Sequence, residues 1–280
     1  MSLKTPVSSC ISVSSSDATG AVGIQADLKT FSALGCYGTG VITAVGSTVH
    51  GNTPVILDTD SVIEQLRFAV EYNGVNAIKL GMLHTPHVVE ALVEELEPLS
   101  KYAHIVADPS FIARGEQWLT ERETAEHIRD DLLPLCTVAT PNIAEAQWLL
   151  NTSLPDSEAI ERAAKELLQL GPKAALIKGG HRHGAYSDDL LAIQYPETQR
   201  TVTWFRSARV SIDRGAGAGC TLSSGITAGI AAGKGIALAT EEAKIYLTAA
   251  LRAGSRWGNA GKNGPLHHFY AWWNHDAGRR

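Results

Sequence analysis

The chain has 280 residues, of which 44% are hydrophobic and 19% are charged, and its formal net charge is −5. This composition is typical of a globular protein with a sizeable core, and the negative charge argues against nucleic acid or an anionic membrane as the main partner. No apolar run reaches the roughly 18 residues of a membrane span, and the N-terminus has no apolar core of signal-peptide length. We therefore expect a protein that is not exported and has no membrane partner.

Four cysteines are spread along the chain, at Cys10, Cys36, Cys136 and Cys220. No two of them have the close spacing of a zinc site, and they are too few for a dense disulfide framework. Reduced thiols and a cytoplasmic location fit this pattern best.

Predicted strands and helices alternate along the sequence. In chain order the helices are expected at 23–34, 61–72, 86–96, 121–133, 143–150, 157–170 and 220–232, and the strands at 41–45, 77–82, 104–107, 137–140, 174–178 and 202–205. Such alternation predicts βαβ units and a mostly parallel sheet with helices on both faces. Because no flexible linker divides the sequence, we expect a single domain over residues 1–280.

Polar side chains follow several predicted strands, where open parallel sheets bind their ligands. Asp108 follows strand 104–107, Asn142 and Glu145 follow strand 137–140 in the first turn of a helix, and Lys178 ends strand 174–178. Asp108 and Glu145 could hold Mg²⁺ against a polyphosphate, or could be ordinary helix-cap and first-turn carboxylates. Lys178 could reach a phosphate, or could be a solvated strand end.

Residues 214–221, "RGAGAGCT", place three glycines before a helix of small residues. Gly215, Gly217 and Gly219 would let backbone N–H groups converge at the helix N-terminus, which favours a bound anion such as phosphate. The pattern is not a P-loop, because GxxxxGK[ST] does not occur in the sequence. A flexible turn is the alternative interpretation.

Cys220 lies at the start of this helix, where the helix dipole would lower the pKa of a thiol. It could act as a proton acceptor or a nucleophile. A small buried hydrophobic side chain, the more common role of cysteine, is the alternative.

Together, six segments resemble the phosphomethylpyrimidine kinases of thiamine biosynthesis, which are members of the ribokinase-like superfamily. The segments are "GIQADLKTFSALGCYGTGVITA" (23–44), "KLGML" (79–83), "ATPNIAEA" (139–146), "LIKGGH" (176–181), "GAGCTLSSG" (217–225) and "GPLHHFYAWW" (264–273). They follow in family order over almost the whole chain. The resemblance implies a three-layer ribokinase-like α/β fold, a homodimer, and ATP- and Mg²⁺-dependent phosphorylation of hydroxymethylpyrimidine and then of its monophosphate.

The resemblance also implies roles for the phosphate side of the site. Gly217, Ala218 and Gly219 match the family's anion hole, and Cys220 matches a cysteine that stands where sugar-kinase relatives carry a catalytic aspartate. Cys220 is then the expected base for the substrate hydroxyl.

On the nucleotide and metal side, Asn142 and Lys178 match positions that bind nucleotide, and Asp108 and Glu145 match metal-side positions. The expected cofactors are therefore ATP and Mg²⁺.

Positions on the substrate side match less uniformly. Asp27 and Met82 match substrate-pocket positions, whereas Ser15, Thr48 and Ser110 replace a glycine, a glutamine and a valine of the family pattern. A threonine hydroxyl cannot supply the paired donor and acceptor of a glutamine amide. We therefore also consider a related kinase for pyridoxal or pyridoxamine, which share an aromatic ring with a hydroxymethyl group, and a degenerate member that binds ligand without catalysis.

Overall fold

A computed structural model describes residues 7–46, 53–113, 117–180, 184–195, 200–210, 216–255 and 265–273. One nine-stranded sheet, in the order β3-β2-β1-β4-β5-β6-β7-β8-β9, runs through these residues. The strands are β1 (Ser9–Asp17), β2 (Tyr37–Gly46), β3 (Val55–Ile56), β4 (Ala77–Leu80), β5 (His104–Ala107), β6 (Val138–Ala139), β7 (Ala174–Ile177), β8 (Tyr186–Gln194) and β9 (Arg200–Ala208). The strands from β2 to β7 in this order are parallel, and β3, β8 and β9 are antiparallel to their neighbours.

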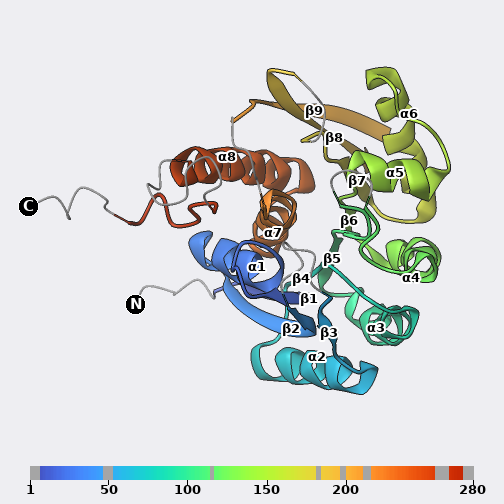
Figure 1. Ribbon diagram of the computed structural model, residues 1–280, viewed down its shortest axis with the longest axis vertical. Coiled ribbons are helices and arrows are strands. Elements are labelled where there is room, and N and C mark those ends of the chain that lie inside the picture. Colours follow the sequence, from blue (N-terminus) through green and yellow to red (C-terminus); the bar gives the residue numbers. More distant parts are fainter. Residues whose placement is uncertain are drawn as a thin grey trace, which may run out of the picture.

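Helices cover both faces of the sheet (Figure 1). One face carries α2 (Thr59–Asn73), α3 (Pro86–Leu99), α4 (Arg122–His127), α5 (Ile143–Leu150) and α6 (Ser157–Leu167), and the other carries α1 (Gly23–Ala33), α7 (Ala218–Ala231) and α8 (Ile236–Gly254). Side chains alternate along the buried strands. Ile105 and Ala107 therefore join the core between the sheet and helices α2 to α6, whereas Val106 joins the core between the sheet and helices α7 and α8. The predicted sheet with two helical layers is therefore confirmed.

Local sequence sets where several helices begin. Asp58, Thr85 and Asp156 each accept a hydrogen bond from a backbone N–H in the first turn of α2, α3 and α6, which satisfies a donor that the helix itself leaves unpaired. Pro86 follows Thr85 at the first helical position of α3, where its missing N–H costs nothing.

β1 was not among the predicted strands, because five of its nine residues are serine and serine is not a strand former. Tertiary contacts override that weak propensity. The strand lies in the interior of the sheet between β2 and β4, and the Ser12 hydroxyl donates to Asp27 at 2.6 Å.

Other elements differ from the prediction as well. The segment predicted as a helix at 121–133 is α-helical only to His127 and continues as a π-helical turn, Ile128–Leu132, and a short 3-10 turn, Leu133–Leu135, in which a proline interrupts regular bonding. β3, β8 and α8 were not predicted. β3 has only two residues, two aspartates lower the hydrophobicity of the first half of β8, and the N-cap of α8 is Gly235, which has no side chain to mark the start of the helix.

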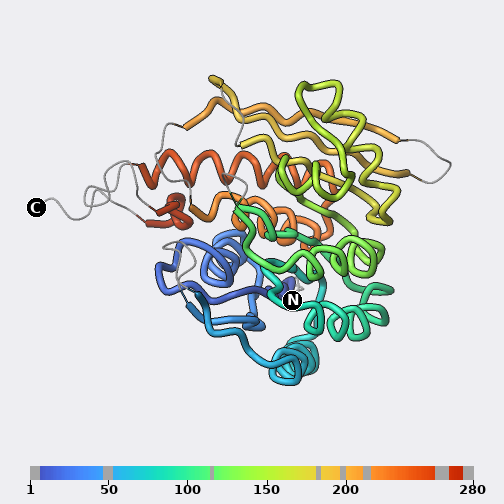
Figure 2. Tube along the Cα trace, turned by 45° about the vertical axis from the view of Figure 1, so that its right-hand side comes forward, coloured from blue at the N-terminus to red at the C-terminus, as the bar shows by residue number. Residues whose placement is uncertain are grey.

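Segments from both ends of the chain lie side by side in the fold. Figures 1 and 2 show α1, near the N-terminus, next to α7, near the C-terminus, and buried Phe31 of α1 and Ala228 of α7 share one small core cluster. No helix in the described ranges is both long and apolar enough to cross a membrane.

Candidate active site

The glycine-rich turn before α7 has a backbone shape that only glycine fits. Gly217 has φ +86°, and a Cβ atom there would lie 1.9 Å from the carbonyl oxygen of Ala21. The helix begins at Ala218, two residues before the predicted start. The turn is therefore packed against the loop between β1 and α1, and its glycine is not a sign of mere flexibility.

Gly219 places this turn against two charged side chains. A Cβ atom on Gly219 would lie 3.7 Å from Asp108 Oδ2 and 3.8 Å from Lys178 Nζ. Lys178 Nζ itself lies 2.5 Å from Asp108 Oδ1. Residues 111 positions apart in sequence, Asp108 and Gly219, thus meet at the carboxyl ends of β5 and β7.

The Lys178–Asp108 ion pair is largely removed from water, since the side chains are 12% and 3% exposed. Burial alone would raise the pKa of Asp108, but the nearby ammonium groups of Lys178 and Lys79 outweigh it and hold that pKa below its ordinary value. Burial would likewise lower the pKa of Lys178, yet the charges of Asp108 and Glu145 raise it. Both groups are therefore charged at neutral pH, and the interpretation of Lys178 as a solvated strand end is wrong.

A second buried ion pair lies beside the first. Lys79 Nζ is 2.9 Å from Asp27 Oδ2, and neither side chain has any exposed surface. Burial would lower the pKa of Lys79, but the charge of Asp27, with smaller effects of Cys220 and Asp108, raises it above its ordinary value.

Adjacent serines of α7 attach the helix to both pairs. Ser223 Oγ lies 3.1 Å from Asp108 Oδ2, and Ser224 Oγ lies 2.7 Å from Asp27 Oδ1. Since these serines follow Cys220 by three and four residues, all three side chains lie on one side of the helix. Cys220 therefore lies on the side of α7 that faces the two carboxylates, whose charges act on it together with that of Lys79.

Cys220 itself is partly buried. Burial raises the pKa of its thiol to about 11, although Lys79 and the Gly23 N–H lower it, and the charges of Asp27 and Asp108 add to the increase. The helix dipole led us to expect a lowered pKa, but the pKa is raised, because burial and the charges of the two carboxylates disfavour the thiolate.

Glu145 and Asn142 form a capping box at the start of α5. The Asn142 side chain accepts from the Glu145 N–H at 3.0 Å, and Glu145 Oε2 accepts from the Asn142 N–H at 2.8 Å. Glu145 Oε1 also accepts from the N–H groups of Phe111 and Ile112. Burial raises the pKa of Glu145 to about 7. The capping interpretation of Glu145 is confirmed, and both of its oxygens already have protein donors.

Of the residues predicted on the substrate side, Ser15 lies near the end of β1, and Met82 and Ser110 lie in the loops after β4 and β5. Ser15 stands where the β1–β2 register shifts between Ser14 and Ser16, Met82 is held through its backbone by Thr43 Oγ1 at 2.9 Å, and Ser110 adopts φ +50°. Thr48 lies outside the described residues.

Asp27 has a different position from that expected. It is fully buried, and its two carboxylate oxygens accept hydrogen bonds from three side chains. This placement does not fit direct contact with a substrate, and Asp27 instead acts on Cys220 through its charge.

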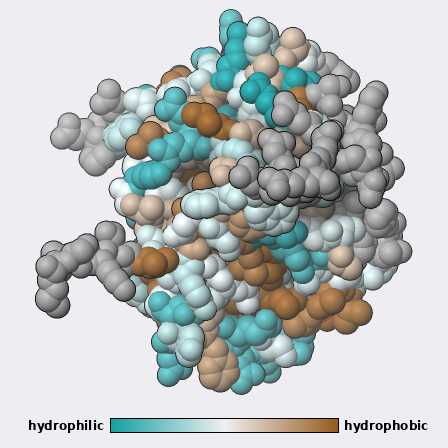
Figure 3. Space-filling view, turned by 90° about the vertical axis from the view of Figure 1, so that its left-hand side faces the viewer, coloured by the Kyte–Doolittle hydropathy of each residue, from teal (hydrophilic) through white to brown (hydrophobic). Residues whose placement is uncertain are grey.

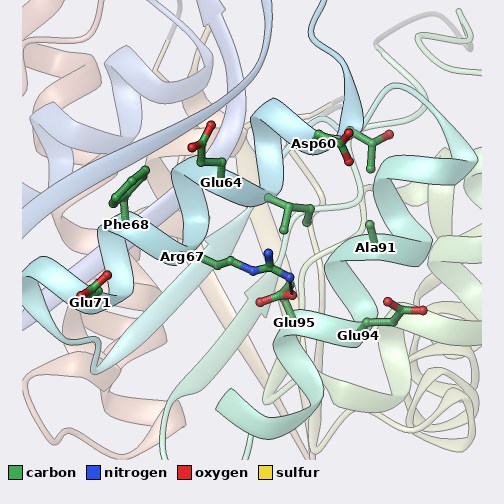
Figure 4. A pocket seen from close by; sticks show the side chains of 10 residues that line it. Asp60, Glu64, Arg67, Phe68, Glu71, Ala91, Glu94 and Glu95 are labelled. Carbon is green, nitrogen blue, oxygen red and sulfur yellow. Dashed lines mark hydrogen bonds and ion pairs between the residues drawn. The ribbon is translucent and has the colours of Figure 1, made fainter.

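Lys79, Ser223 and Ser224 also belong to the site, although their roles were not predicted from the sequence. A lysine within the apolar strand "AIKL" was a usable signal, because a buried lysine needs a charged partner. Nothing local identified the two serines. Elsewhere, a groove of about 580 Å³ between α2 and α3 is crossed by the Arg67–Glu95 ion pair (Figure 4), and none of its lining residues belongs to the predicted site.

Comparison with known proteins places these features in context. The family model of phosphomethylpyrimidine kinase matches residues 17–267. The chain is 35% identical over 266 residues to a hydroxymethylpyrimidine/phosphomethylpyrimidine kinase of Rhizobium meliloti, covering 94% of this chain and 97% of that protein. It is 38% identical over 265 residues to a kinase of the same description from Streptomyces coelicolor, covering 93% of this chain and 94% of that protein.

Solved structures of two kinds of kinase are similar. A phosphomethylpyrimidine kinase of Clostridium difficile matches with a TM-score of 0.73 and 34% identity, covering 87% of this chain and 98% of the other. A pyridoxal kinase of Bacillus subtilis in complex with ADP matches with a TM-score of 0.84 and 30% identity, covering 96% of this chain and 100% of the other. The three-layer architecture is thus the ribokinase-like α/β fold.

Proposed function

Because the chain belongs to the phosphomethylpyrimidine kinase family, and is therefore a phosphotransferase, we propose that it transfers the γ-phosphoryl group of ATP to the hydroxyl of hydroxymethylpyrimidine, and to its monophosphate. The observation that carries this proposal is the convergence of Lys178, Asp108 and Gly219 beside Cys220 at one edge of the sheet. A cradle with cationic groups and glycine N–H donors suits a transferring phosphoryl group.

Cys220, in its thiolate form, is the proposed general base. The substrate oxygen attacks the γ-phosphorus, the bond from that phosphorus to the bridging oxygen of ADP breaks, and the hydroxyl proton goes to the Cys220 sulfur. Lys79, whose charge lowers the pKa of the thiol, favours the thiolate. The N–H groups of Gly217, Ala218 and Gly219 would receive the negative charge that develops on the phosphoryl oxygens.

Lys178 and Asn142 are proposed to bind the nucleotide phosphates. Asp108 is charged and offers oxygen ligands of the kind that Mg²⁺ prefers. Since Glu145 uses both oxygens on backbone N–H groups, we expect it to contact the ion through water. Bound Mg²⁺ would supply charge neutralisation of the β- and γ-phosphates.

Ser15, Thr48, Met82 and Ser110 are proposed to line the acceptor pocket. Pyridoxal is the second candidate acceptor, and the similarity to a pyridoxal kinase with a TM-score of 0.84 favours it. Thr48 in place of the family's glutamine is consistent with a ring that carries different edge groups.

An acceptor assay decides among the candidates. ATP turnover is measured with hydroxymethylpyrimidine, its monophosphate, pyridoxal and pyridoxamine as separate acceptors. We expect kcat/KM to be highest for the pyrimidines. Highest kcat/KM with pyridoxal would transfer the assignment to the second candidate, and turnover with none would favour a ligand-binding member without catalysis.

We also propose a homodimer in the cytoplasm. Apolar residues gather in the lower half of the face shown in Figure 3, and the edge of the sheet exposes Val45, Val55 and Ile56, with Val55 72% exposed. Exposed apolar side chains on an edge strand are typical of contact surfaces. Light scattering of the purified protein tests the dimer.

The proposed cytoplasmic location is supported by the cysteines. All four are free thiols, which suits a reducing compartment.

A further inference from the structure

A third buried ion pair lies outside the groups described above. Asp189 of β8 and Lys244 of α8 are 3% and 5% exposed, and the Lys244 ammonium donates to Asp189 Oδ2. Lys244 also lies 3.3 Å from the Ser187 hydroxyl. Burying two charges has a large desolvation cost. We therefore consider which backbone groups the pair positions.

The other oxygen of Asp189 holds the backbone next to Lys178. The Gly179 N–H donates to Asp189 Oδ1 at 2.8 Å, just beyond the last paired residues of β7 and β8, Ile177 and Leu190. On the other side of the strand, the Lys178 N–H donates to the Pro141 carbonyl at 2.9 Å. The peptide groups on both sides of Lys178 are therefore held by hydrogen bonds.

Arg209 fixes the next residue. Its guanidinium donates to the Gly180 carbonyl at 2.7 Å and to the Gly184 carbonyl at 2.8 Å. The backbone that leaves β7 is thus held by side chains from β8 and from the end of β9.

Lys244 connects this backbone to the helix that carries Cys220. Its neighbour Ala243 packs so closely on α7 that a Cβ atom on Gly225 would lie 2.8 Å from Ala243 Cβ. The α7–α8 layer and the end of β7 are therefore joined through Lys244, Asp189 and Gly179. These are the two structural units whose spacing sets the distance between the Gly219 turn and the Lys178 ammonium.

We propose that Asp189, with Lys244 as its buried counter-ion, is a positioning residue that fixes the Lys178–Gly179 peptide against the glycine turn of α7, so that both contact the same ATP phosphates. This inference rests on the proposed function, in which Lys178 binds those phosphates. A small displacement of such a group is enough to change the rate, because transfer depends on alignment.

Two matched double variants test the role. Asp189→Asn with Lys244→Met removes both charges but keeps an oxygen for the Gly179 N–H, whereas Asp189→Leu with Lys244→Met removes both charges and the acceptor. ATP affinity is measured by calorimetry without any acceptor substrate, and kcat is measured separately. We expect the leucine variant to lose about tenfold or more in ATP affinity or kcat, and the asparagine variant to stay within about threefold of the wild type. The melting temperature of each variant is recorded to show that it is folded.

Wild-type values in both variants, or equal losses in both, would overturn the proposal, because the Gly179 hydrogen bond would then not be what matters. The affinity measurement separates this result from a failure of the proposed function. If the wild type binds ATP but phosphorylates none of the acceptors, the proposed substrate is wrong, and the two affinities still decide the role of Asp189. A wild type that binds no ATP would overturn both.

Discussion

Lys79 and Asp27 form an ion pair with no exposed surface, in which the ammonium nitrogen lies 2.9 Å from a carboxylate oxygen. The Ser12 and Ser224 hydroxyls complete the bonding of this carboxylate. Three segments, β1, α1 and α7, therefore meet β4 around one buried charge pair. This ion pair is stable without a ligand, because Asp27 balances the charge of Lys79 inside the protein.

Lys79→Met is expected to lower the free energy of unfolding by about 3–5 kcal/mol, because it leaves the Asp27 charge buried and unpaired. Lys79→Met combined with Asp27→Asn should be clearly less destabilised, since no charge is left alone. Urea denaturation at neutral pH measures both. A double variant that loses as much as the single one would show that the charge balance is not what matters.

Cys220→Ala is expected to lower kcat by about 10²- to 10⁴-fold, the usual contribution of a positioned general base. ATP affinity should change little, because the thiol is assigned to the acceptor hydroxyl. Steady-state kinetics and calorimetry give the two values. Cys136→Ala is the matched control, since Cys136 is buried on the opposite face of the sheet from α7. An unchanged kcat in Cys220→Ala would remove the thiol from the mechanism.

The pH dependence follows from the raised pKa of Cys220, about 11. A base acts only when deprotonated, and below its pKa the thiolate fraction rises by about tenfold per pH unit, so log kcat/KM for the acceptor should increase with a slope near one between pH 7 and pH 9. This slope should disappear in Cys220→Ala. A flat wild-type profile over that range would contradict the assignment.

Lys178→Met is expected to reduce kcat/KM for ATP by about 10²-fold, because it removes a charge from the phosphate side of the site. Lys173→Met is the control: Lys173 precedes the same strand at its opposite end and is exposed. It should leave kcat/KM unchanged. Similar losses in both variants would indicate a general effect on β7.

Gly217→Ala and Gly233→Ala distinguish backbone strain from a steric clash. Both glycines have positive φ, which should cost an alanine about 1–2 kcal/mol at either position. Only at Gly217 would the new Cβ meet a neighbour, the Ala21 carbonyl, at 1.9 Å, whereas nothing lies within 4 Å at Gly233. The free energy of unfolding should therefore fall further in Gly217→Ala, and equal losses would contradict the close packing of the turn.

Local pattern was sufficient for much of the fold. Residues 143–150 were predicted as a helix with the observed bounds, because apolar spacing and the Asn142–Glu145 cap act within one or two turns. The strand ends that hold Asp108 and Lys178 were also predictable, since parallel strands finish at one edge of a sheet. β1 was not, because its serines are buried only through contacts with distant strands.

The sequence by itself determined the alternating α/β order, the family resemblance and the identity of the residues at the strand ends. Only the tertiary structure decided that Lys79 is paired with Asp27, that Ser223 and Ser224 bind separate carboxylates, and that the Cys220 thiol has a raised pKa. The reason is physical: local propensity acts over a few residues, whereas burial and charge pairing depend on groups that are far apart in sequence and meet only when the sheet and its helices have packed.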